Sequence, residues 1–416
     1  MKLALVGAGQ RGMIYAEYAY NSNRAEIIAV IEPNDERRAI AAEKFKIPIE
    51  RQFTSVNDFY KLGKICDAII IASMDRDHYE HTIQALELSY HILLEKPISP
   101  SPEECLKIQN MANKNGCKVI VCHVLRYTNF FSTIKDIIDS KELGKVISIQ
   151  HNENIGNYHM AHSFVRGNWR RSDLSSPLIM QKSCHDMDIL AWLVDSEAKR
   201  ITSYGSLQYF KKENAPENSS DRCFTCQAAT ECRFDARKSY LPVAGNWPAT
   251  LVTQDQTEEG LLKALETSPY GRCVYRCDND VCDNQVVLIE FKNNVTVSFN
   301  LSGFTNRMCR TIKIMCENGE IRGDDSINTI EVTHFASNAV DAYEQKVIHT
   351  GNVSCGHGGG DIGLLIEFLD LIENGAGKSR SSINKSVESH IMAYAAEQSR
   401  ISGQVIDIDD LKNLLK

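Results

Sequence analysis

The stretch Leu3-Ala4-Leu5-Val6-Gly7-Ala8-Gly9-Gln10-Arg11-Gly12 decides the fold of the first part of the chain. An apolar run leads directly into a Gly-x-Gly-x-x-Gly pattern, and a segment of helical length follows. Glycines at these positions permit a tight turn and let a pyrophosphate approach the backbone at a helix N-terminus. The next apolar run ends in Glu32, where a carboxylate can bind a ribose diol. The pattern predicts a dinucleotide site; the alternative is a glycine turn in another kind of α/β protein. Glu32 would repel a 2′-phosphate, which favours NAD over NADP.

The periodicity of the remaining chain indicates two α/β domains. Apolar runs without alternation are typical of strands buried on both faces of a parallel sheet, and here they are separated by segments of helical spacing. Alternating runs further along indicate antiparallel strands. The non-alternating runs are 3–6, 27–31, 68–72, 90–94 and 118–122, and the alternating ones are 285–291, 295–301 and 311–316. We therefore predict a doubly wound domain over 1–125 and a second α/β domain over 126–416. A polar, irregular, cysteine-bearing insertion is expected at about 205–285.

Composition excludes several classes of protein. The chain has 416 residues, of which 43% are hydrophobic and 24% charged, as in a globular protein with more than one domain. Its net charge is −8 and it lacks a long basic block, which disfavours nucleic acid and anionic membranes as partners. Because no apolar run approaches the roughly 20 residues that cross a bilayer, and the N-terminus does not resemble a signal peptide, we expect a cytoplasmic protein.

Two side chains are candidates for proton transfer. Lys96 lies in Glu95-Lys96-Pro97 at the end of the fourth predicted strand, the sheet edge where ligands bind in open α/β sheets. A lysine there can bind a substrate hydroxyl, although the tripeptide alone fits a surface lysine equally well. His185 opens a helix predicted over 183–194, and Asp188 is three residues further on the same face, where it can orient the imidazole. The alternative is a buried core histidine.

The segment 158–170 is dense in side chains that can grip a sugar. His159, His162 and Arg166 are spaced i, i+3 and i+7, so in a helical turn they share one face, and Trp169 offers a stacking wall. We predict a substrate-binding loop that recognises hydroxyls or a carboxylate; the alternative is a solvated polar loop. A glycine loop before a helix predicted at 362–373 presents His357, with Asp361 as the cap of that helix, unless this loop is only a hinge.

The cysteines form a separate pattern. Six of the fourteen lie between Cys223 and Cys282. The spacing Cys223-x2-Cys226-x5-Cys232 suits a tetrahedral metal, and we predict Cys273 as the fourth ligand, with Cys277 as the other choice. Such a closed site would hold a structural zinc ion; an iron–sulfur cluster uses the same ligands, and unpaired thiols are the remaining alternative.

An ordered set of short motifs resembles the Gfo/Idh/MocA family of oxidoreductases. The set comprises the glycine fingerprint, 71–73 with 77–78, 95–97, 125–127, 169–170 and 185–188. The resemblance implies a Rossmann domain, a second α/β domain with a large open, mainly antiparallel sheet, and a homodimer or homotetramer. It also implies hydride transfer between NAD(P) and a hydroxyl-bearing carbon of a sugar, sugar acid or cyclitol. By position, Lys96 would bind the reacting hydroxyl, His185 would act as general acid/base, and Lys182 would lie near the substrate. The implied cofactor-binding positions are Gly7, Gly9, Gln10, Arg11, Gly12, Glu32, Ser73, His78, Glu95, Lys96, Arg126, Trp169 and Arg170.

One departure from the family pattern opens a second reading. Family dehydrogenases often place an Asp four residues before the histidine, and this chain has Gln181 there. Because an amide cannot take a proton, a relay has to use Lys96 and His185 without that carboxylate. The glycine-histidine loop around His357 also resembles one in NAD-dependent glycosidases of the same superfamily, which work by transient oxidation and elimination. A catalytically dead nucleotide-binding regulator is disfavoured because Lys96 and His185 are both present.

Overall fold

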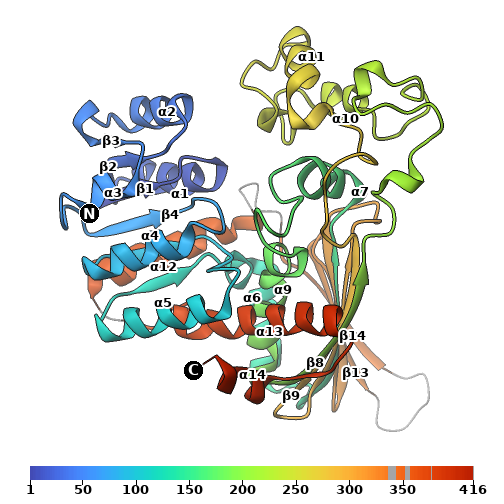
Figure 1. The fold of residues 1–416 in the computed structure, drawn as a ribbon. Coiled ribbons are helices and arrows are strands. Elements are labelled where there is room, and N and C mark those ends of the chain that lie inside the picture. The colour runs from blue at the N-terminus through green and yellow to red at the C-terminus, as the bar shows by residue number, and fades with distance from the viewer. Residues whose placement is uncertain (336–342, 352–356, 376, 416) are drawn as a thin grey trace.

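A computed structural model of the chain describes residues 1–335, 343–351, 357–375 and 377–415. The described residues build two sheets, a six-stranded sheet and a nine-stranded sheet, with helices between and around them (Figure 1). Among these residues, no helix combines the length and the apolar character needed to cross a lipid bilayer.

The first sheet is parallel and has the strand order β3-β2-β1-β4-β5-β6. Its strands are β1 (Lys2–Val6), β2 (Glu26–Ile31), β3 (Gln52–Phe53), β4 (Ala68–Ile71), β5 (His91–Leu94) and β6 (Val119–Val121). The helices are α1 (Gln10–Asn21), α2 (Asp35–Phe45), α3 (Val56–Tyr60), α4 (His78–Glu87) and α5 (Pro102–Lys114). The five predicted apolar runs are confirmed as strands. The sixth strand, β3, has two residues, too few to give a hydrophobic pattern.

The second sheet is mixed and mostly antiparallel, in the order β14-β13-β12-β11-β7-β10-β9-β8-β15, with β7 and β10 paired in parallel. Its strands are β7 (Val146–Asn154), β8 (Ala198–Ser206), β9 (Asn284–Phe291), β10 (Thr296–Ser302), β11 (Cys309–Cys316), β12 (Gly319–Asp324), β13 (Thr329–Phe335), β14 (Tyr343–His349) and β15 (Ile406–Asp407). The helices are α6 (Asn129–Ser140), α7 (Asn157–His159), α8 (Leu178–Gln181), α9 (Cys184–Val194), α12 (Gly360–Asn374), α13 (Ile383–Ser402) and α14 (Ile408–Leu414). The fold class expected from the sequence is confirmed.

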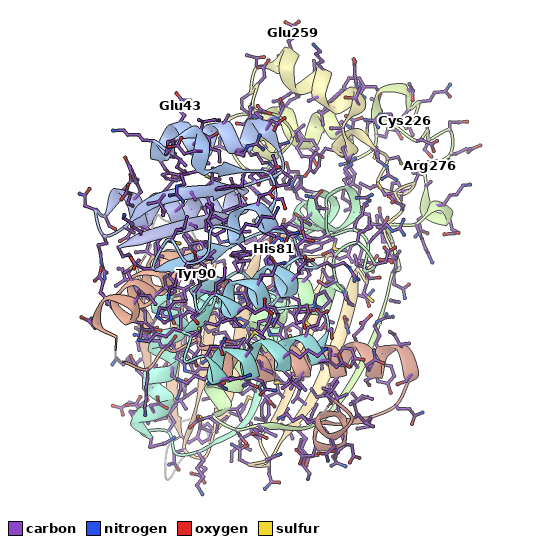
Figure 2. All side chains as sticks on the ribbon, turned by 60° about the vertical axis from the view of Figure 1, so that its left-hand side comes forward. Glu43, His81, Tyr90, Cys226, Glu259 and Arg276 are labelled. Atoms are coloured by element: carbon purple, nitrogen blue, oxygen red, sulfur yellow. The ribbon has the colours of Figure 1, made fainter. Side chains whose placement is uncertain are left out.

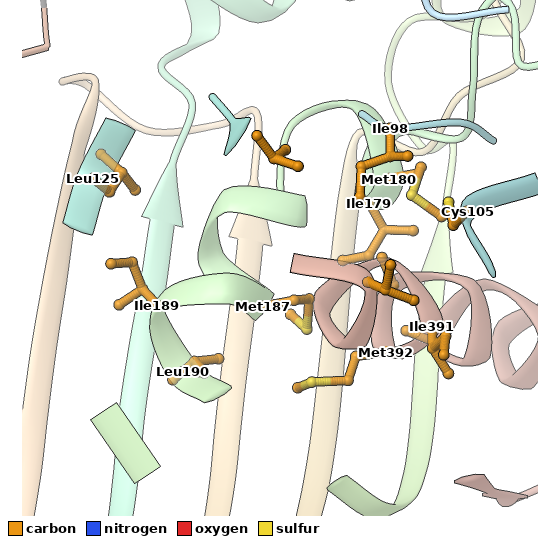
Figure 3. Close-up of a cluster of buried hydrophobic side chains, with 14 of the residues drawn as sticks. Ile98, Cys105, Leu125, Ile179, Met180, Met187, Ile189, Leu190, Ile391 and Met392 are labelled. Atoms are coloured by element: carbon orange, nitrogen blue, oxygen red, sulfur yellow. The ribbon is translucent and has the colours of Figure 1, made fainter. Parts of the chain in front are cut away.

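Helices α9 and α13 fill the space between the two sheets. Met187 and Leu190 of α9 meet Met392 of α13 in a fully buried cluster against the large sheet (Figure 3). Helix α12 returns to the first sheet, where its Leu364 and Phe368 join the core around β1 and α1. Helix α13 contacts β8 of the large sheet and both α5 and β6 of the first domain, so it joins the two domains. The candidate site lies at this junction.

Residues 207–283, which we call the insertion, connect β8 to β9 without a strand. They form short helices, including α10 (Ala236–Tyr240) and α11 (Glu258–Thr267), in a lobe apart from the large sheet (Figure 1). Cys226, Glu259 and Arg276 mark this lobe at the periphery (Figure 2). The sequence predicted an irregular segment at about 205–285, and within it the two helices α10 and α11 form.

Candidate active site

The turn between β1 and α1 has the shape that a pyrophosphate requires. Gly7 has φ +89°, and a Cβ there would meet the carbonyl oxygen of Ala72 at 2.5 Å. A Cβ at Gly12 would lie 2.1 Å from the Gly7 oxygen, so close packing of helix on strand excludes any side chain. At Gly9 a Cβ would meet nothing within 4 Å. The backbone is therefore accessible at Gly9, where a phosphate can approach the helix N-terminus.

Glu32 lies beside this turn at the end of β2 and is buried. Its two carboxylate oxygens accept backbone N–H groups from Ala8 at 2.9 Å and Asn34 at 3.0 Å. Each carboxylate oxygen has a second lone pair, so the group can still accept hydrogen bonds from a ribose diol. The predicted relation between the glycine turn and Glu32 is present in the structure.

Lys96 follows β5 and reaches across to the second domain. Its ammonium Nζ donates to the carbonyl oxygen of Gln181 at 3.1 Å, at the end of α8. Its backbone N–H donates to Glu95 Oε2 at 2.8 Å, while Glu95 Oε1 accepts from Arg11 Nε at 2.8 Å and from the Tyr15 hydroxyl at 2.9 Å. Burial alone would raise the pKa of Glu95, but Arg11 and Lys96 outweigh it and the pKa is lowered. Glu95 is therefore an ionised brace for Lys96.

Arg11 and Asp361 join the same brace. Arg11 Nη2 lies 2.5 Å from a carboxylate oxygen of Asp361, in addition to its bond with Glu95. The expectation that Asp361 caps α12 was wrong, because Gly359 is the N-cap and Asp361 lies in the first helical turn. Arg11 therefore ties the glycine turn to Glu95 and to α12.

His185 lies in the first turn of α9 and is buried, with its ring edge-on to His123 at 5.7 Å between centroids. The expected pairing of His185 with Asp188 was wrong. Both Asp188 oxygens instead accept from Arg126, at 2.6 and 2.7 Å. This pair also occupies Arg126, which the family pattern had placed at the cofactor.

Sequence reasoning missed a buried charge network next to His185. Asp186 accepts from His151 Nε2 and from Arg310 Nε, each at 2.8 Å. Arg310 also pairs with Glu153, whose other oxygen lies 3.4 Å from the ammonium of Lys182. The signal in the sequence was the alternation along β7, which turns His151 and Glu153 inward, but apolar patterning does not reveal a charged network.

Lys182 directly follows Gln181, whose carbonyl oxygen accepts from the Lys96 ammonium. Burial lowers the pKa of Lys182, and Arg310 and Lys96 add to the shift while Glu153 opposes it. The neighbouring Gln181 is buried, and its side-chain oxygen has no hydrogen-bond partner among the described residues. Lys96, Lys182 and the helix that carries His185 are thus brought together as predicted, with an amide in place of the family carboxylate.

Ser73 and His78 make hydrogen bonds that hold the loop after β4 and the loop after β5. The Ser73 hydroxyl lies 2.9 Å from His81 Nδ1. The two ring nitrogens of His78, which is buried, lie 2.7 and 3.1 Å from the carbonyl oxygens of Pro97 and Ser73. His78 therefore connects the end of β4 to the loop that carries Lys96.

The segment 158–170 differs from the substrate loop that we expected. After α7 the chain forms a π-helical turn, Met160–Arg166. His159, His162 and Arg166 all face the insertion: both histidine rings pack edge-on against Trp247, at 5.1 and 5.6 Å, and Arg166 donates to carbonyl oxygens of the insertion. His162 and Arg166 are buried, so in the described chain these two side chains contact protein groups of the insertion.

His159 is half-buried against the insertion. Burial lowers its pKa, and Lys182, His162 and Lys96 add to the shift. Trp169 packs on Phe164, and Arg170 pairs with Asp278 at 2.8 Å. The side chain of His357 lies outside the described residues.

A large cavity in the described chain lies elsewhere. It measures about 1370 Å³ and is bordered by Arg126, Trp192 and Lys385, among others, from helices α5, α6, α9, α13 and α14. Neither Lys96 nor His185 borders it, and the glycine turn is also absent from its lining. We place the active site by the convergence of side chains at the carboxyl edge of the parallel sheet, where α/β proteins bind ligands.

Two sequence profiles of known families match the chain. The profile described as the oxidoreductase family with an NAD-binding Rossmann fold matches residues 1–123, and the one described as the C-terminal alpha/beta domain of the same family matches residues 135–408. The chain belongs to the Gfo/Idh/MocA oxidoreductase family.

Relatives of known sequence agree with this assignment. YteT of Bacillus subtilis, named as an oxidoreductase without a stated substrate, is 24% identical over 84% of this chain and 83% of its own length. Inositol 2-dehydrogenase of Corynebacterium glutamicum is 27% identical over 48% of this chain and 56% of its own length. The family member described here thus spans about half of the length of that dehydrogenase in the alignment.

Solved structures share the whole fold at low identity. Levoglucosan dehydrogenase in complex with NADH and levoglucosan has a TM-score of 0.72 at 17% identity, with 98% of this chain and 99% of that chain covered. An oxidoreductase from Agrobacterium radiobacter, in complex with NAD+, L-tartaric acid and magnesium, has a TM-score of 0.70 at 15% identity and covers 99% of both chains. These likenesses establish the fold over nearly the full chain.

Proposed function

We propose that this family member is an NAD-dependent dehydrogenase that acts on a hydroxyl-bearing carbon of a sugar, sugar acid or cyclitol. The observation that carries the proposal is the reach of Lys96 from the carboxyl end of β5 to Gln181, beside Lys182 and the start of α9. This meeting point lies at the edge of the sheet that carries the glycine turn. The relatives support the chemical class, since inositol 2-dehydrogenase acts on a cyclitol and levoglucosan dehydrogenase binds a sugar derivative.

Different side chains stabilise the substrate oxygen and transfer the hydroxyl proton. NAD, held by the glycine turn and Glu32, supplies the hydride acceptor when it is bound. The Lys96 ammonium hydrogen-bonds the substrate oxygen and stabilises the negative charge that develops on it. His185 takes the hydroxyl proton as general base and returns it in the reverse direction. Glu95, kept ionised by Arg11, holds Lys96 in position through its backbone N–H.

Preference for NAD over NADP rests on Glu32. A 2′-phosphate would be brought against a buried carboxylate whose oxygens are fixed by Ala8 and Asn34. The negative charges of the phosphate and of the Glu32 carboxylate repel strongly where water is excluded.

The decisive experiment uses Lys96→Met with NAD and a panel of free sugars, sugar acids, cyclitols and chromogenic glycosides. We expect wild-type protein to accumulate NADH with one of the free substrates, and Lys96→Met to lower kcat by about a thousandfold or more with little change in NADH affinity. Lys107→Met, which alters an exposed lysine of α5, is the matched control and should leave turnover unchanged. Turnover by Lys96→Met at the wild-type rate would exclude Lys96 from the reaction.

The same panel separates a second candidate, the NAD-dependent glycosidase. Gln181 favours it, because an amide stands where dehydrogenases of the family often have a carboxylate. Aglycone release that requires NAD and accumulates no NADH would replace the dehydrogenase assignment with the glycosidase.

We also propose that the molecule forms a homodimer or homotetramer through the face of the large sheet that the helices leave uncovered. Tyr204, Val286 and Leu288 lie on one face of the neighbouring strands β8 and β9, and each is exposed. Light scattering after size-exclusion chromatography tests this: a monomer at micromolar concentration would contradict it.

A further inference from the structure

Four cysteines of the insertion surround one small cavity. An isolated bridge between Arg222 and Arg272 aligns two segments that lie fifty residues apart, and it places Cys223 beside Cys273. The Cys273 N–H donates to the carbonyl oxygen of Asp221 at 2.9 Å, which fixes this alignment. The fold thus brings the second cysteine segment onto the first.

The cavity selects one set of ligands from the cysteines available. It measures about 20 Å³, and its lining includes Cys223, Cys226, Cys232 and Cys273. That volume accommodates one ion or one water molecule. Cys277 does not line it, because the Cys277 thiol turns away and donates to the carbonyl oxygen of Cys273 at 3.3 Å.

The sulfur of Cys223 is surrounded by donors. The backbone N–H of Ala236 lies 3.4 Å from this sulfur, and Arg166 Nη2 lies 3.5 Å from it. Hydrogen bonds from N–H groups to sulfur stabilise the thiolate form and commonly surround metal-bound cysteines. The second donor is charged, which makes this environment suitable for an anion.

Arg166 supplies a charge that the described chain does not balance. It is 1% exposed, and its guanidinium donates to the carbonyl oxygens of Phe234 and Arg272, both at 2.7 Å. No carboxylate within the described ranges forms an ion pair with it, whereas a buried cation without a counter-charge is costly. Four thiolates around one divalent ion carry a net charge of −2, which would supply the missing anion.

We propose that Cys223, Cys226, Cys232 and Cys273 bind one Zn²⁺ as a structural ion, with Arg166 as its neighbouring counter-charge. Each thiol releases one proton to solvent as its sulfur binds the ion, and no electron is transferred. The ion fixes the insertion to the π-helical turn that ends in Arg166. One buried cluster of the insertion comprises only Cys223, Ala236, Tyr240 and Leu265, and such a small cluster gains stability from a cross-link.

Metal binding has to draw the sulfurs together. In the described chain, the one set of three or more ligating side chains with all donor atoms within 4.8 Å is Cys309, Asp324 and Asp325. No three of the four insertion sulfurs therefore lie within 4.8 Å of one another, whereas Zn–S bonds of about 2.3 Å place the sulfurs of a tetrahedral site roughly 3.8 Å apart. Zn²⁺ binding therefore requires the cysteine side chains to rotate toward one another.

The test compares Cys273→Ser with Cys277→Ser in the full chain. After reduction, incubation with Zn²⁺ and removal of unbound metal, we expect about one zinc per chain in the wild type and in Cys277→Ser, and less than about 0.2 in Cys273→Ser. Cobalt in place of zinc should give the intense thiolate-to-metal absorption of a tetrahedral site in the first two proteins alone. NADH binding reports whether the dinucleotide-binding domain of each variant is folded.

A second ligand variant keeps the test decisive if Cys273→Ser does not fold. Cys226 is half-exposed, so Cys226→Ser should leave the core intact and still lose the metal. Less than about half an equivalent of zinc in the reconstituted wild type would overturn the proposal. Equal metal loss in Cys277→Ser would also overturn the ligand set, and iron with acid-labile sulfide would overturn the assignment to zinc.

Discussion

Two buried regions balance their charges in opposite ways. One is the charge network beside His185, which we call the floor of the active site; the other is the contact between Arg166 and the insertion. The floor comprises His151, Glu153, Asp186, Arg310, Arg126 and Asp188. On the floor, each buried arginine faces a carboxylate: Arg310 pairs with Asp186 and Arg126 pairs with Asp188. Against the insertion, Arg166 of the π-helical turn is equally buried but meets carbonyl groups and a thiol. The first region is complete as the chain folds, whereas the second needs an anionic centre that the chain builds only when its thiols are ionised. The difference predicts that the two regions respond differently to the loss of a charge.

The largest effect is expected from Asp186→Asn on the floor. The change leaves Arg310 with Glu153 as its one remaining ion-pair partner in the described structure, and it removes the charge that His151 faces. Breaking a buried pair in this way should lower the free energy of unfolding by about 3–5 kcal/mol. Denaturant unfolding measures the loss, with Asp173→Asn, at an exposed ion pair, as the control. A loss below about 1 kcal/mol would show that the floor tolerates an unbalanced charge.

The contrast also explains what the sequence could predict. The parallel sheet, the glycine turn, Glu32 and Lys96 were predictable because a local pattern decides each of them: a continuous apolar run, a spacing of glycines, or a strand end. The pairing of Arg126 with Asp188 joins residues 62 positions apart, and no local pattern contains it. Helical spacing favoured His185 as the partner of Asp188, but tertiary packing supplied a stronger one.

The segment 158–170 shows the same limit in another form. Spacing correctly placed His159, His162 and Arg166 on one side, but it could not show what covers that side. The insertion contributes the covering groups, including Trp247 and Phe234, from more than sixty residues further along the chain. The cysteine spacing predicted a metal site with Cys273 as its fourth ligand, and the folded cavity supports that choice over Cys277.

An effect of intermediate size is expected when the pH is lowered, because His162, which packs against the insertion, changes the pH dependence of the free energy of unfolding. Burial, followed by Arg166, lowers the pKa of His162 from 6.5 to about 3. Below pH 6.5 the unfolded chain therefore binds a proton that the folded chain does not, and stability falls as the pH is lowered toward 3. One such proton changes the free energy of unfolding by about 1.4 kcal/mol per pH unit.

His162→Phe tests this slope. Phenylalanine can keep the stacking on Tyr270, where the rings lie 4.7 Å apart and 7° from parallel, but it cannot be protonated. We expect the pH dependence of stability between about pH 6 and 4 to become shallower by one proton in the variant. Loss of the contact with the Tyr240 hydroxyl lowers stability by an amount independent of pH, so the difference between the two slopes isolates the titration. Identical slopes would show that His162 is protonated in the folded protein.

The smallest effect is expected from Asp278→Asn, at the rim of the insertion. Asp278 pairs with Arg170 at 2.8 Å and with Arg272 at 2.6 Å, and the guanidinium groups hold its pKa below the ordinary value against a weaker effect of burial. Its side chain is 38% exposed, so water and salt screen both pairs. We expect a loss of less than about 1 kcal/mol, which shrinks further at high ionic strength. A loss as large as that of Asp186→Asn would contradict the contrast between the regions. It would mean that Asp278 positions Arg272, whose carbonyl oxygen accepts from Arg166. The Asp278 carboxylate would then stabilise the buried Arg166 indirectly, through Arg272.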